Sequence, residues 1–174
     1  MKLLKLSAIL LLTVSLTFCS KDTTPEENLE TADRVLEGGD PVGCETVNLI
    51  AAQNYDAGDF TISENEDGDL ILRYETMDGW EINEIHLYAG DCAEVPMNTP
   101  GNPKIGNFPI SETLANGTTV YEYLLDVADG TTFCGCIAAH AVVSNSGQTE
   151  TAWAEGIDFP GNSWAMFNEF CGCS

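Results

Sequence analysis

Six of the seven cysteines in this chain constrain its fold more than any other feature, because each needs a partner if the protein is exported. These six are Cys44, Cys92, Cys134, Cys136, Cys171 and Cys173. An even set of cysteines in an exported protein is typical of a disulfide framework. We therefore expect the part of the chain that contains them, residues 44–174, to be a domain cross-linked by disulfides.

The N-terminus has the layout of a secretory signal. Lys2 and Lys5 precede an apolar stretch from Leu6 to Phe18, and Cys19 stands where cleavage is expected. A helix that crosses a bilayer needs about 20 apolar residues, so this stretch is too short to be one. We expect residues 1–18 to be a signal peptide that directs the chain out of the cytoplasm.

The residues around the cleavage point favour lipidation. Leu16-Thr17-Phe18-Cys19 resembles a bacterial lipobox, although Phe18 is larger than the residue that usually precedes the cysteine. Cys19-Ser20-Lys21-Asp22 is similar to the start of surface-exported lipoproteins of the Bacteroidota. The resemblance implies that Cys19 carries acyl chains such as palmitate and anchors an outer-membrane lipoprotein at the cell surface. The alternative is an ordinary secretory peptide with an incidental cysteine.

The chain is strongly acidic, with 28 aspartate and glutamate residues against six lysine and arginine residues. Loss of residues 1–18 removes two of those lysines and makes the mature chain more acidic still. Such a chain repels phosphate backbones, so we expect no nucleic-acid partner. The acidity serves solubility or, alternatively, the binding of divalent cations or of a cationic partner.

Residues 19–43 form an acidic linker rich in Thr, Glu, Asp and Gly. Thr24, Pro25 and Glu27 have the order of a helix N-terminus, with Thr24 as the N-cap and Pro25 at the first helical position. A short isolated helix is marginal in water. We expect either one short helix over residues 25–37 or a spacer without regular structure.

Beyond the linker, short apolar and alternating segments predict an all-β domain. Asp67-Gly68 is a hairpin signal, and Met77 to Trp80 has the composition of a second turn. Many short strands joined by turns are typical of an antiparallel β-sandwich. The expected strands begin near Val47 and continue at residues 59–63, 70–74, 82–88, 120–127, 132–143, 149–154 and 164–170.

Residues 90–118 are rich in Pro, Gly and Asn and predict a long loop, which is usually functional or held by a cross-link.

The sequence leaves several pairings of the six cysteines open. Cys134-Gly135-Cys136 and Cys171-Gly172-Cys173 match, so they can form two neighbouring bridges and leave Cys44 with Cys92. Alternatively, Cys44 joins Cys171 or Cys173, or four converging thiolates hold zinc.

The two histidines are the first candidates for chemistry. His140 lies in a segment that is apolar on both faces, as in a covered central strand, and His86 lies in a more mixed one. Histidines of this kind usually make ordinary hydrogen bonds in the core. The alternative is an acid–base or metal site that joins both imidazoles to Glu84 or Glu155.

Two further sets of residues are candidate ligand sites. Carboxylates on loops are compatible with a calcium site, although no cofactor is required, and the candidates are Asp67, Asp69 and Asp91. Aromatic side chains gathered on one exposed face would stack on sugar rings. The aromatic candidates are Trp80, Tyr88, Trp153 and Trp164.

Several short motifs of the domain resemble an extracellular module of secreted and surface proteins of Bacteroidota and other microbes, whose activity is uncharacterised. They include Glu84-Ile85-His86-Leu87-Tyr88, Cys136-Ile137-Ala138-Ala139-His140-Ala141 and Glu150-Thr151-Ala152-Trp153-Ala154. The resemblance implies a compact β-sandwich over residues 44–174 and carries no catalytic residue across.

We expect a lipid-anchored binding or adhesion module whose partner, besides the membrane, is an extracellular ligand such as a glycan or a protein. The alternatives are a small secreted hydrolase or metal-dependent enzyme centred on His86 and His140, and a structural envelope lipoprotein.

Overall fold

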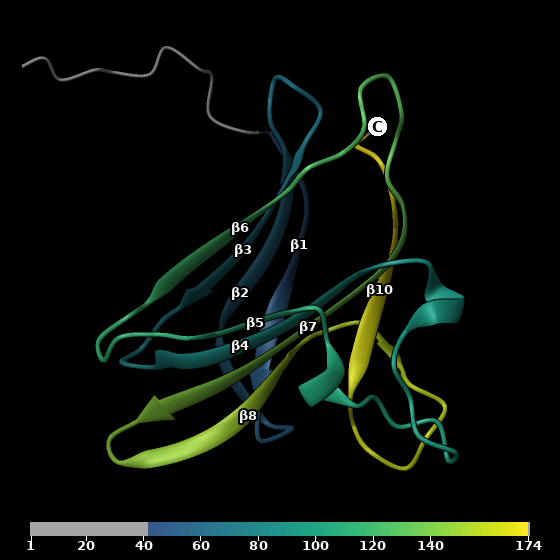
Figure 1. Cartoon of the computed structure of the whole chain (residues 1–174). Helices are drawn as coiled ribbons and strands as arrows, with labels where there is room; N and C mark the ends of the chain where they lie inside the picture. The colour runs from purple at the N-terminus through teal and green to yellow at the C-terminus, as the bar shows by residue number, and fades with distance from the viewer. Residues whose placement is uncertain (1–41, 174) are drawn as a thin grey trace, which may run out of the picture. The chain divides into compact units, whose positions relative to one another are not determined.

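The computed structural model describes residues 42–173, which form an antiparallel all-β domain, as expected (Figure 1). Among these residues, no helix has the length and apolarity to cross a membrane. The predicted linker helix and the signal peptide lie outside the described residues. The strands are β1 (Val42–Ala51), β2 (Tyr55–Glu64), β3 (Leu70–Thr76), β4 (Glu81–Gly90), β5 (Ile110–Thr113), β6 (Val120–Leu125), β7 (Cys134–Asn145), β8 (Gln148–Ala154), β9 (Ile157–Asp158) and β10 (Met166–Cys171), with 3-10 helices η1 (Cys92–Glu94) and η2 (Ile105–Asn107).

One curled sheet contains most of the strands, in the order β5-β4-β7-β8-β1-β2-β3-β6. Strand β7 is the hub of the sheet. It pairs with β4 along one edge, and along the other edge it pairs first with β10 and then with β8. Figure 1 shows the curl as two groups of strands, β1, β2, β3 and β6 in one and β4, β5, β7 and β8 in the other.

The main core fills the inside of this curl. It combines side chains from both groups of strands, so the two groups face each other as in a sandwich. The alternation of each strand decides which residues enter it, because every second side chain points inward. The largest fully buried members are Tyr74, Phe60, Leu49, Ile62, Leu70, Leu72, Ile82, Ile85, Leu87, Ile137 and Val143.

A β-bulge in β4 changes which residues share a face. Ile82 pairs with Val143 and Glu84 with Val142, so Asn83 is an extra residue without its own partner. Ile82 and Ile85 are three positions apart and both lie in the main core, which strict alternation does not allow. The bulge thereby directs Glu84, His86 and Tyr88 to the opposite face of the sheet.

That opposite face carries a second apolar cluster, which lies under the loops before β5 and before β10. Strand β7 supplies Cys136 and Ala138 to it, while Ile137 and Ala139 of the same strand enter the main core. The prediction that this segment is covered on both faces is therefore confirmed. The cluster consists of Tyr88, Val95, Phe108, Cys136, Ala138, Trp153, Phe159 and Ala165.

All six cysteines of the domain form disulfides, which removes the thiolate zinc site from consideration. The bonds are Cys44–Cys173, Cys92–Cys136 and Cys134–Cys171. The alternative in which Cys44 joins Cys171 or Cys173 is confirmed, with Cys173 as the partner. The two Cys-Gly-Cys motifs share one bridge, Cys134–Cys171, and not two neighbouring bridges.

The other alternative, two neighbouring bridges between the motifs with Cys44 bonded to Cys92, is wrong. Cys136 is paired with Gly90 of β4. Cys92 follows Gly90 by two residues and therefore lies close enough to bond with Cys136. Gly172 adopts a positive φ of 64° after the end of β10, and the chain turns there before Cys173 meets Cys44. Cys44 is the extra residue of a bulge in β1, between the paired residues Gly43 and Glu45.

The turns agree with the sequence, whereas two short strands, β5 and β9, were not predicted. The Asp67-Gly68 segment joins β2 to β3, where the Asn65 amide donates to the Asp69 carbonyl. The second turn, at Asp78 and Gly79, joins β3 to β4, which are not neighbours in the sheet. Strand β5 has four residues, of which only Ile110 is partly buried. Its sequence therefore lacks the alternation of apolar and polar residues that predicts a strand.

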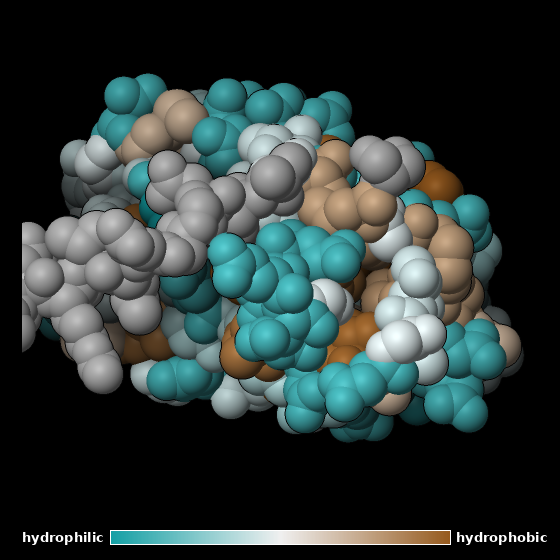
Figure 2. Space-filling model, turned by 90° about the horizontal axis from the view of Figure 1, so that it is seen from above, coloured by the Kyte–Doolittle hydropathy of each residue, from teal (hydrophilic) through white to brown (hydrophobic). Residues whose placement is uncertain are grey.

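Figure 2 shows one end of the molecule, where hydrophilic residues cover most of the visible surface and hydrophobic areas are small and separated. The chain as a whole is acidic, with 28 aspartate and glutamate residues against six lysine and arginine residues. Of the described residues only Arg73 and Lys104 are basic, and Arg73 forms ion pairs with Glu75 and Glu122 at 3.0 and 2.6 Å.

Replacing Tyr74 by Phe is expected to stabilise the domain. Tyr74 is fully buried and its hydroxyl has no hydrogen-bond partner among the described residues. Burial raises the pKa of Tyr74 well above its ordinary value, and the neutral hydroxyl is left without water. Tyr74→Phe should raise the free energy of unfolding by about 1 kcal/mol in urea denaturation of the oxidised protein.

Tyr121→Phe is the matched control, because the Tyr121 hydroxyl donates to Glu112 Oε2 at 2.8 Å and its removal brings no such gain. A lower free energy of unfolding for Tyr74→Phe would show that the Tyr74 hydroxyl has a partner after all.

Candidate functional site

The two histidines lie side by side on the outer face of the sheet. His86 of β4 is paired directly with His140 of β7, and their Nδ1 atoms are 3.3 Å apart. His140 is 1% exposed and His86 is 9% exposed. The structure therefore brings together the two residues that the sequence offered for acid–base chemistry.

Glu84 completes this group, whereas Glu155 does not. The Glu84 Oε1 atom lies 3.2 Å from His86 Nε2, because residues two apart on a strand share a face. Glu155 is exposed and accepts a hydrogen bond from Asn48 Nδ2 at 2.9 Å. The group that can exchange protons is the series Glu84, His86 and His140.

Aromatic side chains pack against His140 on the side away from His86. His140 is paired with Trp153 of β8, and the two rings meet edge to face with centroids 4.8 Å apart. Trp153 in turn contacts Phe108 and Phe159 from the two covering loops. Burial, and then the electrostatic influence of the neighbouring His86 ring, lower the pKa of His140 to about 3, so this imidazole is neutral over the physiological pH range.

A cavity of about 250 Å³ opens beside His140 and Trp153. Its walls come from β7, β8 and both covering loops, and they combine indole, imidazole, amide and hydroxyl groups. The lining residues are Asn102, Pro103, Ile105, His140, Thr151, Trp153, Ser163, Trp164 and Ala165.

A second hollow of about 370 Å³ shares Ser163 and Trp164 with the first, so the partly buried Trp164 belongs to the walls of both. Its other lining residues are Gln53, Asp158, Phe159, Gly161 and Asn162. The two hollows form one candidate binding site, which we call the Trp164 site.

Asn102 holds the two covering loops together at the Trp164 site. Its Oδ1 atom accepts hydrogen bonds from the backbone amides of Asn162 and Ser163 at 2.7 and 2.8 Å. Gly161 is required there, since a Cβ atom at this position would lie 2.0 Å from Asn102 Oδ1. Sequence reasoning missed Asn102 and Ser163, because the contact joins segments 60 residues apart with no local pattern.

The four aromatic candidates occupy different places. Trp80 lies in the main core, while Tyr88 and Trp153 lie in the second cluster, and each is less than 9% exposed. Tyr88 also donates its hydroxyl to the Asp91 carbonyl at 2.6 Å. Trp153 and Trp164 line the same cavity, so a flat exposed platform of all four is not formed.

Of the three calcium candidates, Asp69 and Asp91 accept hydrogen bonds from backbone amides. Asp69 Oδ1 accepts from the Val127 amide at 3.0 Å, and Asp91 Oδ1 accepts from the Ala93 amide at the start of η1. Asp67 is exposed in the β2–β3 turn, where its amide donates to Asn65 Oδ1. The structure does not gather these three carboxylates into one group.

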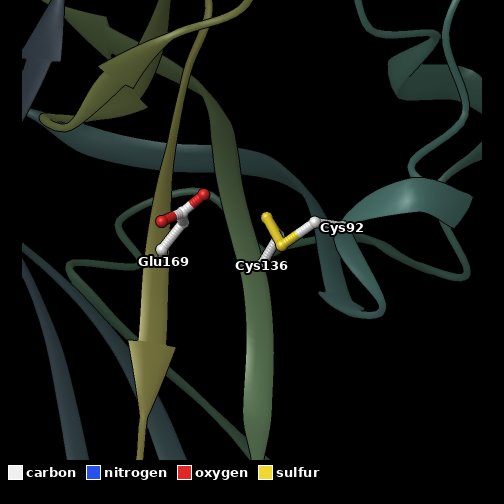
Figure 3. Close-up of side chains that lie close together, drawn as sticks. All are labelled: Cys92, Cys136 and Glu169. Atoms are coloured by element: carbon white, nitrogen blue, oxygen red, sulfur yellow. A yellow bond between two sulfur atoms is a disulfide. The ribbon is translucent and has the colours of Figure 1, made fainter.

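One other group of potential ligand atoms occurs among residues 42–173: Cys92, Cys136 and Glu169, which lie within 4.8 Å of one another. Figure 3 shows the two sulfur atoms joined in a disulfide and the Glu169 carboxylate extending beside them from β10. Because disulfide sulfurs are not thiolates, Glu169 is the one metal ligand that this group offers.

Comparison with known proteins does not identify a family or a function for this chain. No protein-family model matches the chain, and no curated protein or solved structure matches it significantly. What the Trp164 site can bind is therefore set by the groups that line it.

The buried His140 makes stability depend on pH in a defined direction. An unfolded histidine titrates near pH 6.5, whereas folded His140 titrates at about 3, so the unfolded chain takes up a proton first as pH falls. This lowers the stability of the folded state progressively from about pH 6.5 towards pH 3, and has no effect above that window.

Comparison with His140→Gln, which cannot titrate, should isolate this contribution. The free energy of unfolding of the natural protein should fall relative to that of His140→Gln by roughly 3 kcal/mol between pH 6.5 and 4, measured by urea denaturation. The carboxylates are common to both proteins and cancel in the difference. A difference that stays constant with pH would contradict a buried neutral imidazole.

Proposed function

We propose that this chain is a lipid-anchored cell-surface binding module, with the Trp164 site as the place where an extracellular glycan binds. One observation carries the proposal: a partly buried indole lies between two hollows whose walls present amide and hydroxyl groups. Sugar recognition uses this combination, with an aromatic face against the ring and polar groups against the hydroxyls.

The charge of the site supports a neutral ligand. Neither hollow is lined by a lysine or an arginine, and His140 is neutral. An anionic glycan would meet the strongly acidic chain without a cation to pair with at the site. A neutral polyhydroxylated ligand avoids this repulsion and can still use the amide and hydroxyl groups.

The location is part of the same proposal. The Cys19 lipid anchor would hold the domain at the outer surface of a Bacteroidota-type outer membrane, and residues 20–43 would separate it from the lipid. Three disulfides suit an oxidising compartment, which supports export but does not identify the membrane.

A second candidate function is hydrolysis or another acid–base reaction centred on His86 and His140. The observation that favours it is the series Glu84, His86 and His140, which resembles the way enzymes orient an imidazole. Ser163 and Thr151 supply hydroxyls in the same cavity, but neither is hydrogen-bonded to His140. Hydrolysis would therefore require a hydroxyl to move into contact with His140, whereas ligand binding requires no such rearrangement.

Replacing Trp164 by Ala tests the binding proposal. Soluble residues 20–174 should be retained on at least one neutral polysaccharide in a pull-down panel, run with and without calcium. Trp164→Ala should weaken that retention about tenfold or more, because the aromatic contact is lost.

Tyr55→Ala is the control for this test, since Tyr55 is an aromatic residue that is 57% exposed and lines neither hollow. Equal loss in both variants would refute the Trp164 site. Absence of retention on every polysaccharide, for the natural protein, would favour the structural envelope role instead.

Mass spectrometry of the protein from its native host tests the anchor. The mature chain should begin at an acylated Cys19, and Cys19→Ser should move the protein out of the membrane fraction because no acyl chain is attached. A free Cys19 thiol on a chain that keeps residues 1–18 would exclude lipidation.

A further inference from the structure

We propose that Glu84 and His86 hold His140 in one tautomer, with Nδ1 protonated and Nε2 bare, so that His140 acts as a hydrogen-bond acceptor for a hydroxyl group of a ligand in the Trp164 site. This inference rests on the proposed binding function and names the ligand group that the site selects.

The series starts at Glu84. A carboxylate only accepts hydrogen bonds, so the 3.2 Å contact between Glu84 Oε1 and His86 Nε2 places a proton on His86 Nε2. In the neutral form of His86 this is the one ring proton, so Nδ1 carries a lone pair. Glu84 itself is partly exposed.

The contact between the two Nδ1 atoms then decides which nitrogen of His140 carries the proton. Two bare nitrogens do not hydrogen-bond, so the 3.3 Å contact between the two Nδ1 atoms requires His140 Nδ1 to donate to His86 Nδ1. The low pKa of His140 means that it carries a single proton, and that proton is the one on Nδ1. His140 Nε2 is therefore an acceptor.

Nothing in the described residues uses this acceptor. The one hydrogen bond found for His140 joins its Nδ1 atom to His86, and Nε2 is not among the fully buried atoms of the described residues that lack a partner. The His140 side chain lines the cavity of about 250 Å³ beside Trp164, where a ligand group can reach it. An incoming hydroxyl can satisfy it by donating.

The same tautomer discriminates between ligand groups. A hydroxyl can donate to Nε2, whereas a carboxylate, a sulfate or an O-methyl group offers only lone pairs to it and leaves the acceptor unpaired. Leaving a buried group unpaired in this way costs about 1–3 kcal/mol, which corresponds to roughly tenfold or more in affinity.

Nuclear magnetic resonance of the full chain, labelled with 15N and with its disulfides oxidised, tests the tautomer without any ligand. Long-range 1H–15N spectra at neutral pH should show His140 protonated on Nδ1 and His86 protonated on Nε2. The chain has two histidines, so His86→Asn assigns the signals. A His140 protonated on Nε2 would overturn the inference and leave the proposed binding function intact.

Glu84→Gln tests the origin of the preference, because an amide can either accept from or donate to His86 Nε2. The variant should populate both tautomers of His140 and bind the retained neutral polysaccharide several-fold more weakly. Glu66→Gln, a change to an exposed acidic residue of the β2–β3 turn, is the matched control and should change neither. An unchanged His140 tautomer in Glu84→Gln would refute the role of Glu84.

The ligand group is tested with the neutral polysaccharide panel and its O-methylated counterpart. Methylation should abolish retention by the natural protein. Equal retention of the methylated form would overturn the acceptor role of His140. The predicted tautomer without retention on any polysaccharide would overturn the ligand assignment together with the proposed function, so the two failures are distinguishable.

Discussion

The rest of the structure depends on β7 being covered on both faces. One face of this strand packs Ile137, Ala139, Ala141 and Val143 into the main core, and the other packs Cys136, Ala138 and His140 under the covering loops. Four of these residues are Ala or Cys, which lets neighbouring side chains and loops approach closely. Gly135 takes this further, because a Cβ atom there would lie 2.3 Å from the Gly90 carbonyl oxygen. A strand packed in this way is a rigid support for a binding site.

The disulfides extend the same support by linking four segments in series. Cys44 of β1 is bonded to Cys173, Cys171 to Cys134, and Cys136 to Cys92, with one glycine between successive bonds in each Cys-Gly-Cys motif. The bond from Cys44 closes a chain segment of 129 residues, which in the chain-entropy model destabilises the unfolded state by about 4–5 kcal/mol. The bond to Cys92 fixes the start of the loop that covers Trp153. The covering loop before β5 is thus held to β7 covalently as well as by packing.

The sequence predicts the strands better than it predicts their faces or contacts. Alternation and the Asp67-Gly68 turn identify β2 and β3, because both are local signals. The bulge at Asn83 has no local signal, yet it decides that Ile82 and Ile85 share the core and that His86 faces His140. The pairing of His86 with His140 and the contact of Asn102 with Ser163 join residues far apart in the chain, so they follow only from the topology. The histidines were identifiable by residue type, but the cavity beside them was not.

The acidic composition of the chain and the uncharged lining of the cavity beside His140 belong together. A chain with 28 acidic and six basic residues repels anions over most of its surface, and Arg73 is already paired with two glutamates. Recognition by charge would be restricted to cations under these conditions. The cavity beside His140 works differently, because its groups are indoles, amides, hydroxyls and an imidazole that burial keeps uncharged. Selectivity at such a site comes from shape and from the direction of hydrogen bonds, which salt screens far less than it screens ion pairs. The position of the single proton on His140 therefore matters more here than the net charge of the protein.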